Sequence, residues 1–407
     1  MFRLGLSEGI FECCSPASLG EPEFLAQEQH ISSRARSNLV TSASGNLQLY
    51  FQKWQSDRHD RVRSVVFVHH GETEHSGWYN ALAVRLAAVG CTTFALDAQG
   101  WGQSDGARGY FEGLEELVND FVEFCKTKWA EVLNTQTKVH SMRRPGLVLM
   151  GKGFGALVAM RALLELQELA DTWGVTPVLV LVSPAFQFAD FISEQSNVSC
   201  GLNSQQCARQ PVAQCARDGV AYAPECAATP SQPWACRTTE YNKKGQPIGR
   251  RFTPVQDTGQ HQKLEQMSHW FPKMIVTQPV DPDMVSRDPQ TVDRMTRDVL
   301  CWRQGYRSRV LDEIVHEQLS LADSIMENAE VFVRTPALIL HGSGDKLFAV
   351  QGSHGLHSVW CDAAQKRGIV PRLKVYYGAF HQLLNEPNKD EVMNDIVVFI
   401  ASKAIPA

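Results

Sequence analysis

The stretch LVLMGKGFGALVAM, residues 147–160, joins a short apolar run to a helical pattern through three closely spaced glycines. Leu147–Met150 is predicted to be a buried strand, and Ala156–Glu168 a helix. Gly151, Gly153 and Gly155 permit a sharp turn between them, because glycine adopts backbone conformations that other residues avoid. The other predicted strands and helices lie on both sides of this strand–turn–helix unit in the sequence.

Similar patterns alternate on both sides of this turn. Strands are predicted at residues 64–68, 92–96, 178–182, 337–340 and 373–377, after a hairpin within 38–54. Helices are predicted at residues 79–89, 114–129, 292–302, 308–325 and 390–402. Strands separated by helices favour a parallel sheet with right-handed crossovers. The sequence therefore predicts an α/β protein with a mostly parallel, doubly wound sheet.

The alternation stops near Ala185 and resumes far along the chain. We expect an irregular leader at 1–36, a core in two parts at 37–189 and 330–407, and an inserted cap, or lid, at 190–329. A stretch at about 196–265 is polar and aperiodic, which suggests a flexible part of the cap. Such an insertion is expected over the carboxyl edge of the sheet, where ligands bind in these folds.

Composition excludes several classes of protein. The chain has 407 residues, of which 43% are hydrophobic and 20% charged, as in ordinary globular proteins. A net charge of −5 argues against nucleic acid as the main partner. No apolar run approaches the ~20 residues that span a bilayer, and the first residues make no convincing secretory signal. We expect a cytoplasmic protein, or one peripheral to a membrane, with no cofactor and no metal.

Five cysteines fall in the aperiodic stretch, where they are either reduced loop thiols or locally paired. No C-x-x-C spacing occurs there, so a zinc site has little support. The residues concerned are Cys200, Cys207, Cys215, Cys226 and Cys236.

Polar residues follow the predicted strands in a telling order. Asp345 lies in HGSGD after one strand and His381 in YYGAFH after the last, both downstream of the glycine turn. Turn, acid and histidine occur in this order in α/β-hydrolases. Five stretches resemble the monoacylglycerol lipase and lysophospholipase-like branch of that fold, a serine aminopeptidase-type family: VVFVHHGETEHSGWY (65–79), DAQGWGQSDGARGY (97–110), DPDMVSRDP (281–289), TPALILHGSGDKLF (335–348) and LKVYYGAFHQLLNE (373–386).

The resemblance implies a role for several residues. Asp345 and His381 would be the acid and base of a catalytic triad, and a carboxylate beside an imidazole suits that task. The backbone amides of Glu72 and Phe154 would form the oxyanion hole, and Gly151 and Gly155 would frame the nucleophile turn. The ligand would be a lipid ester or another acyl compound.

The family nucleophile is missing. Gly153 occupies the serine position of G-x-S-x-G, so no hydroxyl is available to form an acyl-enzyme. Glu72 is also atypical, because this branch prefers a small residue there. A carboxylate that pointed into the hole would repel a developing oxyanion. Lys152 stands where this branch usually has histidine. A side-chain oxygen within bonding reach of the His381 imidazole would indicate a different nucleophile.

Several functional interpretations remain open. The protein is a non-catalytic acyl-lipid-binding or interaction protein, or a slow hydrolase in which His381 and Asp345 activate water, or a chain in which a parental serine was replaced. GKGFGA also fits a dinucleotide fingerprint, but Asp171 falls before the next strand rather than at its end. Ser104 lies in a second G-x-S-x-G after the wrong strand and is expected to bond locally. Ser183 and Ser343 are expected to be loop residues.

The cap contains two features that suit a lipid surface. Residues 269–276, HWFPKMIV, are largely apolar and either line a mouth that faces lipid or pack as a helix on the core. Four basic residues either favour an anionic membrane or form a solvated loop. They are Lys243, Lys244, Arg250 and Arg251.

Overall fold

The computed structural model describes residues 38–55, 62–137, 144–189, 259–364 and 368–404. The predicted leader, the five cysteines at 200–236 and the four basic residues of the cap lie outside these ranges. The chain divides into two units, Met1–Leu39 and Val40–Ala407. All the elements that carry the site belong to the second unit.

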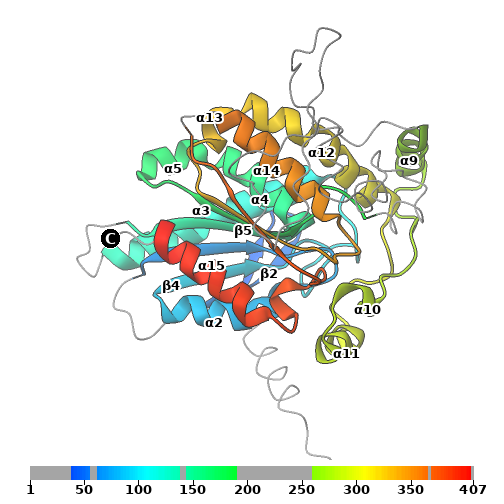
Figure 1. The fold of residues 1–407 in the computed structure, drawn as a ribbon, viewed down its shortest axis with the longest axis horizontal. Helices are drawn as coiled ribbons and strands as arrows, with labels where there is room; N and C mark the ends of the chain where they lie inside the picture. Colours follow the sequence, from blue (N-terminus) through cyan, green and yellow to red (C-terminus); the bar gives the residue numbers. More distant parts are fainter. Residues whose placement is uncertain (1–37, 56–61, 138–143, 190–258, 365–367, 405–407) are drawn as a thin grey trace, which may run out of the picture. The chain divides into compact units, whose positions relative to one another are not determined.

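An eight-stranded sheet forms the centre of this unit, with the order β1-β2-β4-β3-β5-β6-β7-β8 (Figure 1). β2 is antiparallel to β4, and every pair from β4 through β8 is parallel, which confirms the predicted mostly parallel sheet. The strands are β1 (Leu39–Thr41), β2 (Gln48–Trp54), β3 (Ser64–His69), β4 (Cys91–Leu96), β5 (Gly146–Gly153), β6 (Val178–Pro184), β7 (Ala337–Gly342) and β8 (Arg372–Tyr376).

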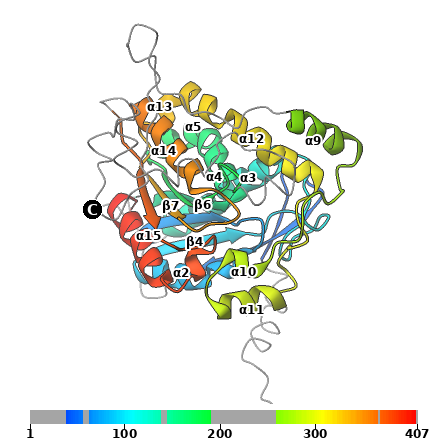
Figure 2. The same cartoon turned by 45° about the vertical axis from the view of Figure 1, so that its right-hand side comes forward.

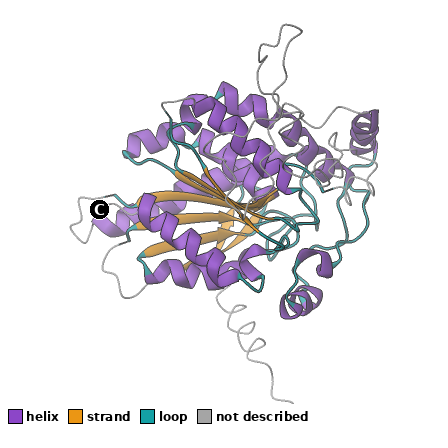
Figure 3. Ribbon diagram, viewed as in Figure 1, coloured by secondary structure: helices purple, strands orange, loops and turns teal. Residues whose placement is uncertain are grey.

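Helices cover both faces of the sheet (Figures 1 and 3). β3, β4 and β6 are buried along their whole length, as expected for largely apolar strands in a sheet covered on both sides. One face carries α2 (Asn80–Ala88) and α15 (Lys389–Lys403). The other carries α3 (Leu114–Thr137), α4 (Phe154–Glu165), α5 (Gln167–Trp173) and α14 (Val350–Ala364), and on these helices pack α12 (Ser308–Glu327) and α13 (Ala329–Phe332).

Some helices differ from their predicted bounds. The helix predicted at 156–168 is two helices, α4 and α5, which meet at Leu166. α14 was not predicted, because its glycines and polar residues hide an apolar face on which Leu356 and Trp360 are buried. α9 (Gly259–Trp270) begins inside the stretch predicted to be aperiodic up to 265, so that prediction was wrong there. Most side chains of α9 are polar, and only a narrow strip of the helix, which includes Leu264, is buried.

α9 and the two short helices that follow it lie in the segment predicted to be a cap and outside the layers on the sheet, whereas α12 of the same segment packs against α3 and α14. α10 (Pro282–Val285) and α11 (Pro289–Arg297) follow α9, and each has proline in its first turn and an aspartate cap (Figure 2). Between them, Arg287 forms a salt bridge with the buried Glu386 at 2.6 Å, which ties this segment to the loop after β8. No helix among the described residues is both long enough and apolar enough to cross a membrane.

Candidate functional site

The turn at the end of β5 brings backbone segments unusually close together. Gly153 has φ 53° and ψ −128°, a conformation that strains any residue with a side chain. A Cβ atom on Gly151 would lie 2.1 Å from the carbonyl oxygen of Gly155, and one on Gly155 would lie 2.3 Å from that of His70. The sequence Gly-x-Gly-x-Gly therefore suits this strand-to-helix turn.

His381 and Asp345 meet at the carboxyl ends of β8 and β7. The two side chains are fully buried, with His381 Nδ1 2.8 Å from Asp345 Oδ2. The other oxygen of Asp345 accepts hydrogen bonds from the amides of Leu347 and Phe348, at 2.8 and 3.0 Å. These donors fix the carboxylate in the orientation that aligns the imidazole.

His341 is a further contact of Asp345 that the sequence analysis missed. Its Nε2 lies 3.2 Å from Asp345 Oδ2. Burial alone would raise the pKa of Asp345, but the His381 charge and the hydrogen bonds from both histidines hold it well below its usual value. The carboxylate is therefore ionised at every physiological pH. The histidine in the HGSGD motif was the signal that pointed to this contact.

The Glu72 carboxylate points into the site and occupies its centre. Its Oε1 lies 3.1 Å from His381 Nε2, as an ion pair whose atoms are not aligned as a regular hydrogen bond. Its Oε2 accepts a 3.3 Å hydrogen bond from the Phe154 amide. A Cβ on Gly153 would lie only 2.2 Å from Oε2. The carboxylate thus fills the space beside the turn, and an amide expected to be open to an oxyanion already binds an anion.

The charge on His381 follows from these neighbours. Burial lowers the pKa of the imidazole and so does the nearby Lys152 ammonium, but the Asp345 and Glu72 carboxylates outweigh both and raise it to about 9. At neutral pH, His381 is therefore an imidazolium held between two carboxylates. A general base must be unprotonated to accept a proton, so this histidine is in the wrong state for that task.

Lys152 forms a second buried ion pair behind the first. Its ammonium lies 3.2 Å from Glu74 Oε2, and both side chains are buried. Glu74 also accepts hydrogen bonds from Gln382 Nε2, at 2.8 Å, and from the Tyr79 hydroxyl. Burial opposes ionisation of Glu74, but Lys152 and these donors lower its pKa to about 2. The sequence analysis did not identify Glu74, although it lies two residues after Glu72 in the same motif.

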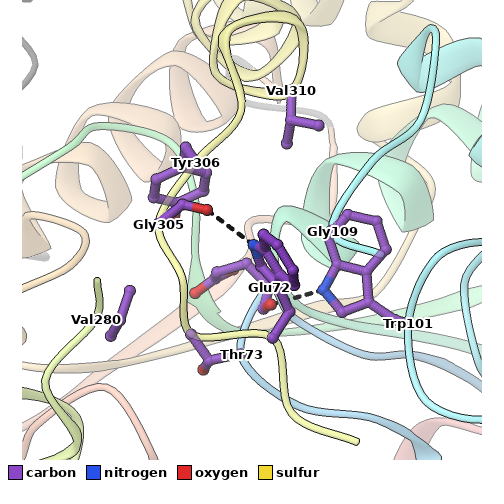
Figure 4. Close-up of a pocket in the computed structure, with 9 residues that line it drawn as sticks. Glu72, Thr73, Trp101, Gly109, Val280, Gly305, Tyr306 and Val310 are labelled. Atoms are coloured by element: carbon purple, nitrogen blue, oxygen red, sulfur yellow. Dashed lines mark hydrogen bonds between the residues drawn. The ribbon is translucent and has the colours of Figure 1, made fainter. Parts of the chain in front are cut away.

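A small pocket adjoins Glu72 (Figure 4). Its lining is mainly aromatic and aliphatic, and includes Trp101, Trp302, Tyr306 and Val310. The two indole N–H groups are already used: Trp101 donates to the Glu72 carbonyl oxygen at 2.7 Å, and Trp302 donates to that of Gly305 at 2.8 Å. The pocket therefore offers an apolar surface next to one carboxylate.

Comparisons with known proteins agree with this fold. The family described as "Serine aminopeptidase, S33" matches residues 60–213 and 251–388. The chain belongs to this α/β-hydrolase family. It is 24% identical to the monoacylglycerol lipase of Mycolicibacterium smegmatis, over 91% of this chain and 99% of that protein. It is 25% identical to the human monoglyceride lipase, over 85% and 84% of the two chains. The predicted monoacylglycerol lipase-like lineage is confirmed.

Solved structures show the same fold at low sequence identity. The monoacylglycerol lipase of Paleococcus ferrophilus has 19% identity and a TM-score of 0.54, covering 87% of this chain and 99% of its own. A soluble variant of the Saccharomyces cerevisiae monoglyceride lipase, in complex with a substrate analog, has 13% identity and a TM-score of 0.61, covering 89% and 94%.

The three serines considered as alternative nucleophiles form hydrogen bonds away from the His381 imidazole ring. Ser104 Oγ donates to the Asp97 carbonyl oxygen at 2.6 Å and accepts from the Tyr50 amide at 2.8 Å. Ser183 Oγ donates to the backbone oxygen of His381, at 2.9 Å, and Ser343 Oγ accepts from the Gly378 amide at 2.8 Å. The hydroxyls of all three are thus engaged with backbone groups rather than with the imidazole ring.

The dinucleotide interpretation finds no support in the position of its acidic residue. Asp171 lies on α5, before β6, and forms an exposed pair with Arg334 at 3.2 Å. The glycine turn instead faces a buried carboxylate, which would repel a pyrophosphate.

One group of side chains in the described residues has the spacing of a metal site. The ligand atoms of His75, Asp298 and Cys301 lie within 4.8 Å of one another. His75 Nδ1 accepts from the Gly77 amide, so its Nε2 carries the proton and donates to Asp298 at 3.0 Å. Trp78 Nε1 donates to the same carboxylate oxygen at 3.1 Å. These hydrogen bonds account for the close approach of His75 and Asp298.

The apolar segment of the cap is exposed. Trp270 and Phe271 are 72% and 61% exposed, and Met274 and Ile275 are also exposed. The alternative that these four side chains pack on the core is therefore wrong. Only Val276, at the end of this segment, packs against the core.

Proposed function

We propose that this protein is a catalytically impaired member of the monoacylglycerol lipase-like hydrolases, which binds an acyl lipid without cleaving it by the serine route. The observation that carries the proposal is the Glu72 carboxylate, 3.1 Å from His381 Nε2 and 3.3 Å from the Phe154 amide. An ester-cleaving site needs a nucleophilic hydroxyl and an empty oxyanion hole at these two places.

Three steps of ester hydrolysis are blocked by different physical causes. Gly153 has no hydroxyl, so no acyl-enzyme forms on the turn. Glu72 occupies the Phe154 amide and repels a second negative charge at short range. His381 is already protonated at neutral pH and accepts no proton from water.

The slow, water-activating alternative predicts a distinct pH profile. Hydrolysis of that kind requires neutral His381, so its rate would rise as pH increases toward about 9 and then level off. Hydrolysis with this profile, abolished by His381→Gln, would favour the alternative over the impaired enzyme.

The apolar lining of the small pocket next to Glu72 favours a lipid ester or another acyl compound as the ligand. Its lining of Trp101, Trp302, Tyr306 and Val310 provides apolar contact. The relatives are named as lipases for monoacylglycerols, which makes a single acyl chain the first ligand to test.

The exposed part of the cap supports contact with a membrane surface. Trp270, Phe271, Met274 and Ile275 together present apolar side chains to solvent, as interfacial segments do. Replacing Trp270 and Phe271 by serine should weaken sedimentation with phosphatidylcholine vesicles. Val84→Ser, a change at an exposed position on α2, should not weaken it. Equal binding of both variants would contradict a role for the cap.

The proposed function is tested with a fluorophosphonate probe and with monoacylglycerol turnover at pH 7. We expect no labelled serine and no turnover above the no-protein rate, together with quenching of tryptophan fluorescence by a non-cleavable acyl ether of glycerol. Labelling of any serine with turnover typical of esterases would contradict the proposal. The variant with Gly153→Ser and Glu72→Ala provides the positive control for the assay.

A further inference from the structure

We propose that His75, Asp298 and Cys301 together bind one zinc ion, which links the segment predicted to be a cap to the core. The inference goes beyond the proposed function and does not depend on it, because the site uses neither His381 nor the glycine turn.

The three ligand atoms come from two distant parts of the chain. His75 directly precedes the short helix Ser76–Tyr79, which follows β3, whereas Asp298 caps the end of α11 and Cys301 lies in the turn after it. His75 and Asp298 are 223 positions apart, yet His75 Nε2 lies 3.0 Å from Asp298 Oδ2. The Cys301 thiol completes a group whose ligand atoms lie within 4.8 Å of one another. An ion bound there joins the cap segment to the core.

The kinds of ligand atom select the metal. An imidazole nitrogen, a thiol sulfur and a carboxylate oxygen are ligands that zinc takes in proteins, whereas calcium and magnesium take oxygen. In a tetrahedral zinc site, neighbouring ligand atoms lie roughly 3.3–3.6 Å apart, as follows from bonds of ~2.0 Å to nitrogen and oxygen and ~2.3 Å to sulfur. The separations here, 3.0 Å between nitrogen and oxygen and at most 4.8 Å for any pair, come close to that spacing.

The Asp298 carboxylate is already held in position. Its Oδ1 accepts a hydrogen bond from the Leu300 amide at 3.0 Å, and its Oδ2 accepts one from Trp78 Nε1 at 3.1 Å. The Cys301 amide donates to the Asp298 carbonyl oxygen at 3.2 Å, which closes the turn that places the thiol beside the carboxylate. Hydrogen bonds around a metal site orient its ligands in this way.

The three side chains are sheltered but still reach the surface. The side chains of His75 and Asp298 are 8% and 9% exposed, and Cys301 is 9% exposed. An ion therefore meets little competing water inside the site and can still arrive from solvent. With three protein ligands, the fourth position goes to water, as in other zinc sites of this composition.

Two guanidinium groups decide which ligand charges the site needs. Arg108 and Arg294 both lie close enough to interact with the Asp298 charge and with a Cys301 thiolate. A divalent ion beside two cations requires anionic ligands that cancel its own charge. The carboxylate of Asp298 and the thiolate of Cys301 meet this requirement, whereas uncharged ligands would not.

Binding of the ion balances with the release of one proton. Without metal, the His75 proton is on Nε2, because Nδ1 accepts from the Gly77 amide at 3.2 Å. When the ion takes the Nε2 lone pair, this proton moves to Nδ1, and the hydrogen bonds of His75 to Gly77 and Asp298 are lost. The Cys301 thiol gives its proton to water. Three bonds to the metal replace two hydrogen bonds, and the ion with its ligands is neutral.

Cobalt(II) is the probe for the first experiment, because it occupies zinc sites and absorbs through charge transfer from a thiolate. The reduced full chain, freed of metal by a chelator, is titrated with cobalt chloride. We expect a thiolate band that disappears when zinc chloride is added. Cobalt binding without a thiolate band would mark an adventitious ion only and would overturn the proposal.

Variants assign the band to these residues. Cys301→Ser and His75→Gln should each weaken cobalt binding by more than ~100-fold, because even the loss of an outer contact costs about 10–100-fold. Trp78→Phe, which removes only the donor to Asp298, should weaken it by roughly 10-fold. Cys361→Ser, a matched change at a partly exposed cysteine of α14, should leave it unchanged. A band of the same strength and affinity in Cys301→Ser or in His75→Gln would contradict the assignment.

A measurement on the unaltered chain covers the case in which a variant fails to fold. X-ray absorption by the chain with one equivalent of zinc should show one sulfur at ~2.3 Å and lighter atoms at ~2.0–2.1 Å. Two or more sulfurs around the ion would place it among other cysteines of the chain and overturn the proposal. Serine labelling by a fluorophosphonate would instead contradict only the proposed function.

Discussion

The two halves of the sheet's carboxyl edge place different groups beside the His381 imidazole. On the side of β7 and β8, Asp345 is fixed by amides and by His341, and it aligns His381 as a triad acid would. On the side of β3 and β5, the turn keeps its backbone conformation, but Gly153 carries no side chain and the carboxylate of Glu72 stands beside it.

The difference shows that the orientation of the histidine and the backbone of the turn can persist in this site while the groups that would attack an ester are replaced. The orientation of His381 depends on Asp345 and not on a nucleophile, so it survives without a serine. Glu72 and Gly153 are complementary, because the carboxylate needs the space that a Cβ would take. The half at β7 and β8 therefore retains the acid–histidine arrangement of a hydrolase. In the half at β3 and β5, the Glu72 carboxylate forms an ion pair with His381 where a hydrolase has a neutral hydroxyl.

The largest expected effect comes from restoring the hydroxyl. Gly153→Ser alone should stay inactive on esters, because its Cβ would collide with Glu72 Oε2 at 2.2 Å and its φ of 53° is strained. Adding Glu72→Ala should raise kcat/KM on p-nitrophenyl esters by roughly 10²–10³-fold over Gly153→Ser, the value of a freed oxyanion donor. Glu72→Ala alone is the control without a nucleophile. Equal activity of the single and double serine variants would show that Glu72 does not block the site.

The buried pair behind the turn should give the next largest effect. Lys152→Met leaves the Glu74 carboxylate buried without its cation, so we expect a loss of about 3–5 kcal/mol in the free energy of unfolding. Adding Glu74→Gln should recover most of that loss in urea denaturation.

A surface pair provides the matched control for this prediction. Lys126→Met removes an exposed partner of Glu123 and should cost at most about 1 kcal/mol. Similar losses for Lys152→Met and Lys126→Met would mean that the inner pair contributes no more than a surface one.

A smaller effect should appear on raising the pH. The folded pKa of His381, about 9, lies above the ordinary 6.5 of an unfolded histidine. Its contribution to stability is therefore complete below pH 6.5 and is lost as pH rises through about 9. We expect the unfolding midpoint to fall between pH 7 and pH 10 by more in the native chain than in Glu72→Gln, where one of the two carboxylates is absent. If the unfolding midpoint falls equally with pH in both chains, Glu72 does not influence the charge on His381.

The smallest effect should come from the half that retains the hydrolase arrangement. His341→Gln removes one contact of Asp345 but leaves the amides of Leu347 and Phe348 in place. We expect a loss of about 1 kcal/mol in unfolding free energy and an unchanged imidazolium signal of His381 in the proton NMR spectrum. Disappearance of that signal would show that Asp345 depends on His341 for its orientation.

Much of this fold was predictable from local pattern. The largely apolar runs that form β3 to β7 have the length and spacing of buried parallel strands. Asp345 follows β7, and His381 follows the more exposed β8. α9 and α14 were missed because their helical faces bury only a few side chains, so that polar residues and glycines dominate their sequences.

The sequence by itself determined the sheet, the glycine turn, the missing hydroxyl and the order of acid and base, because these depend on residues close together in the chain. Only the tertiary structure decided where the Glu72 carboxylate points, that Lys152 pairs with Glu74, and that His381 is charged. The physical reason is that a pKa and an ion pair depend on distances of a few ångströms between residues that are far apart in the chain, and on burial that removes water from between them.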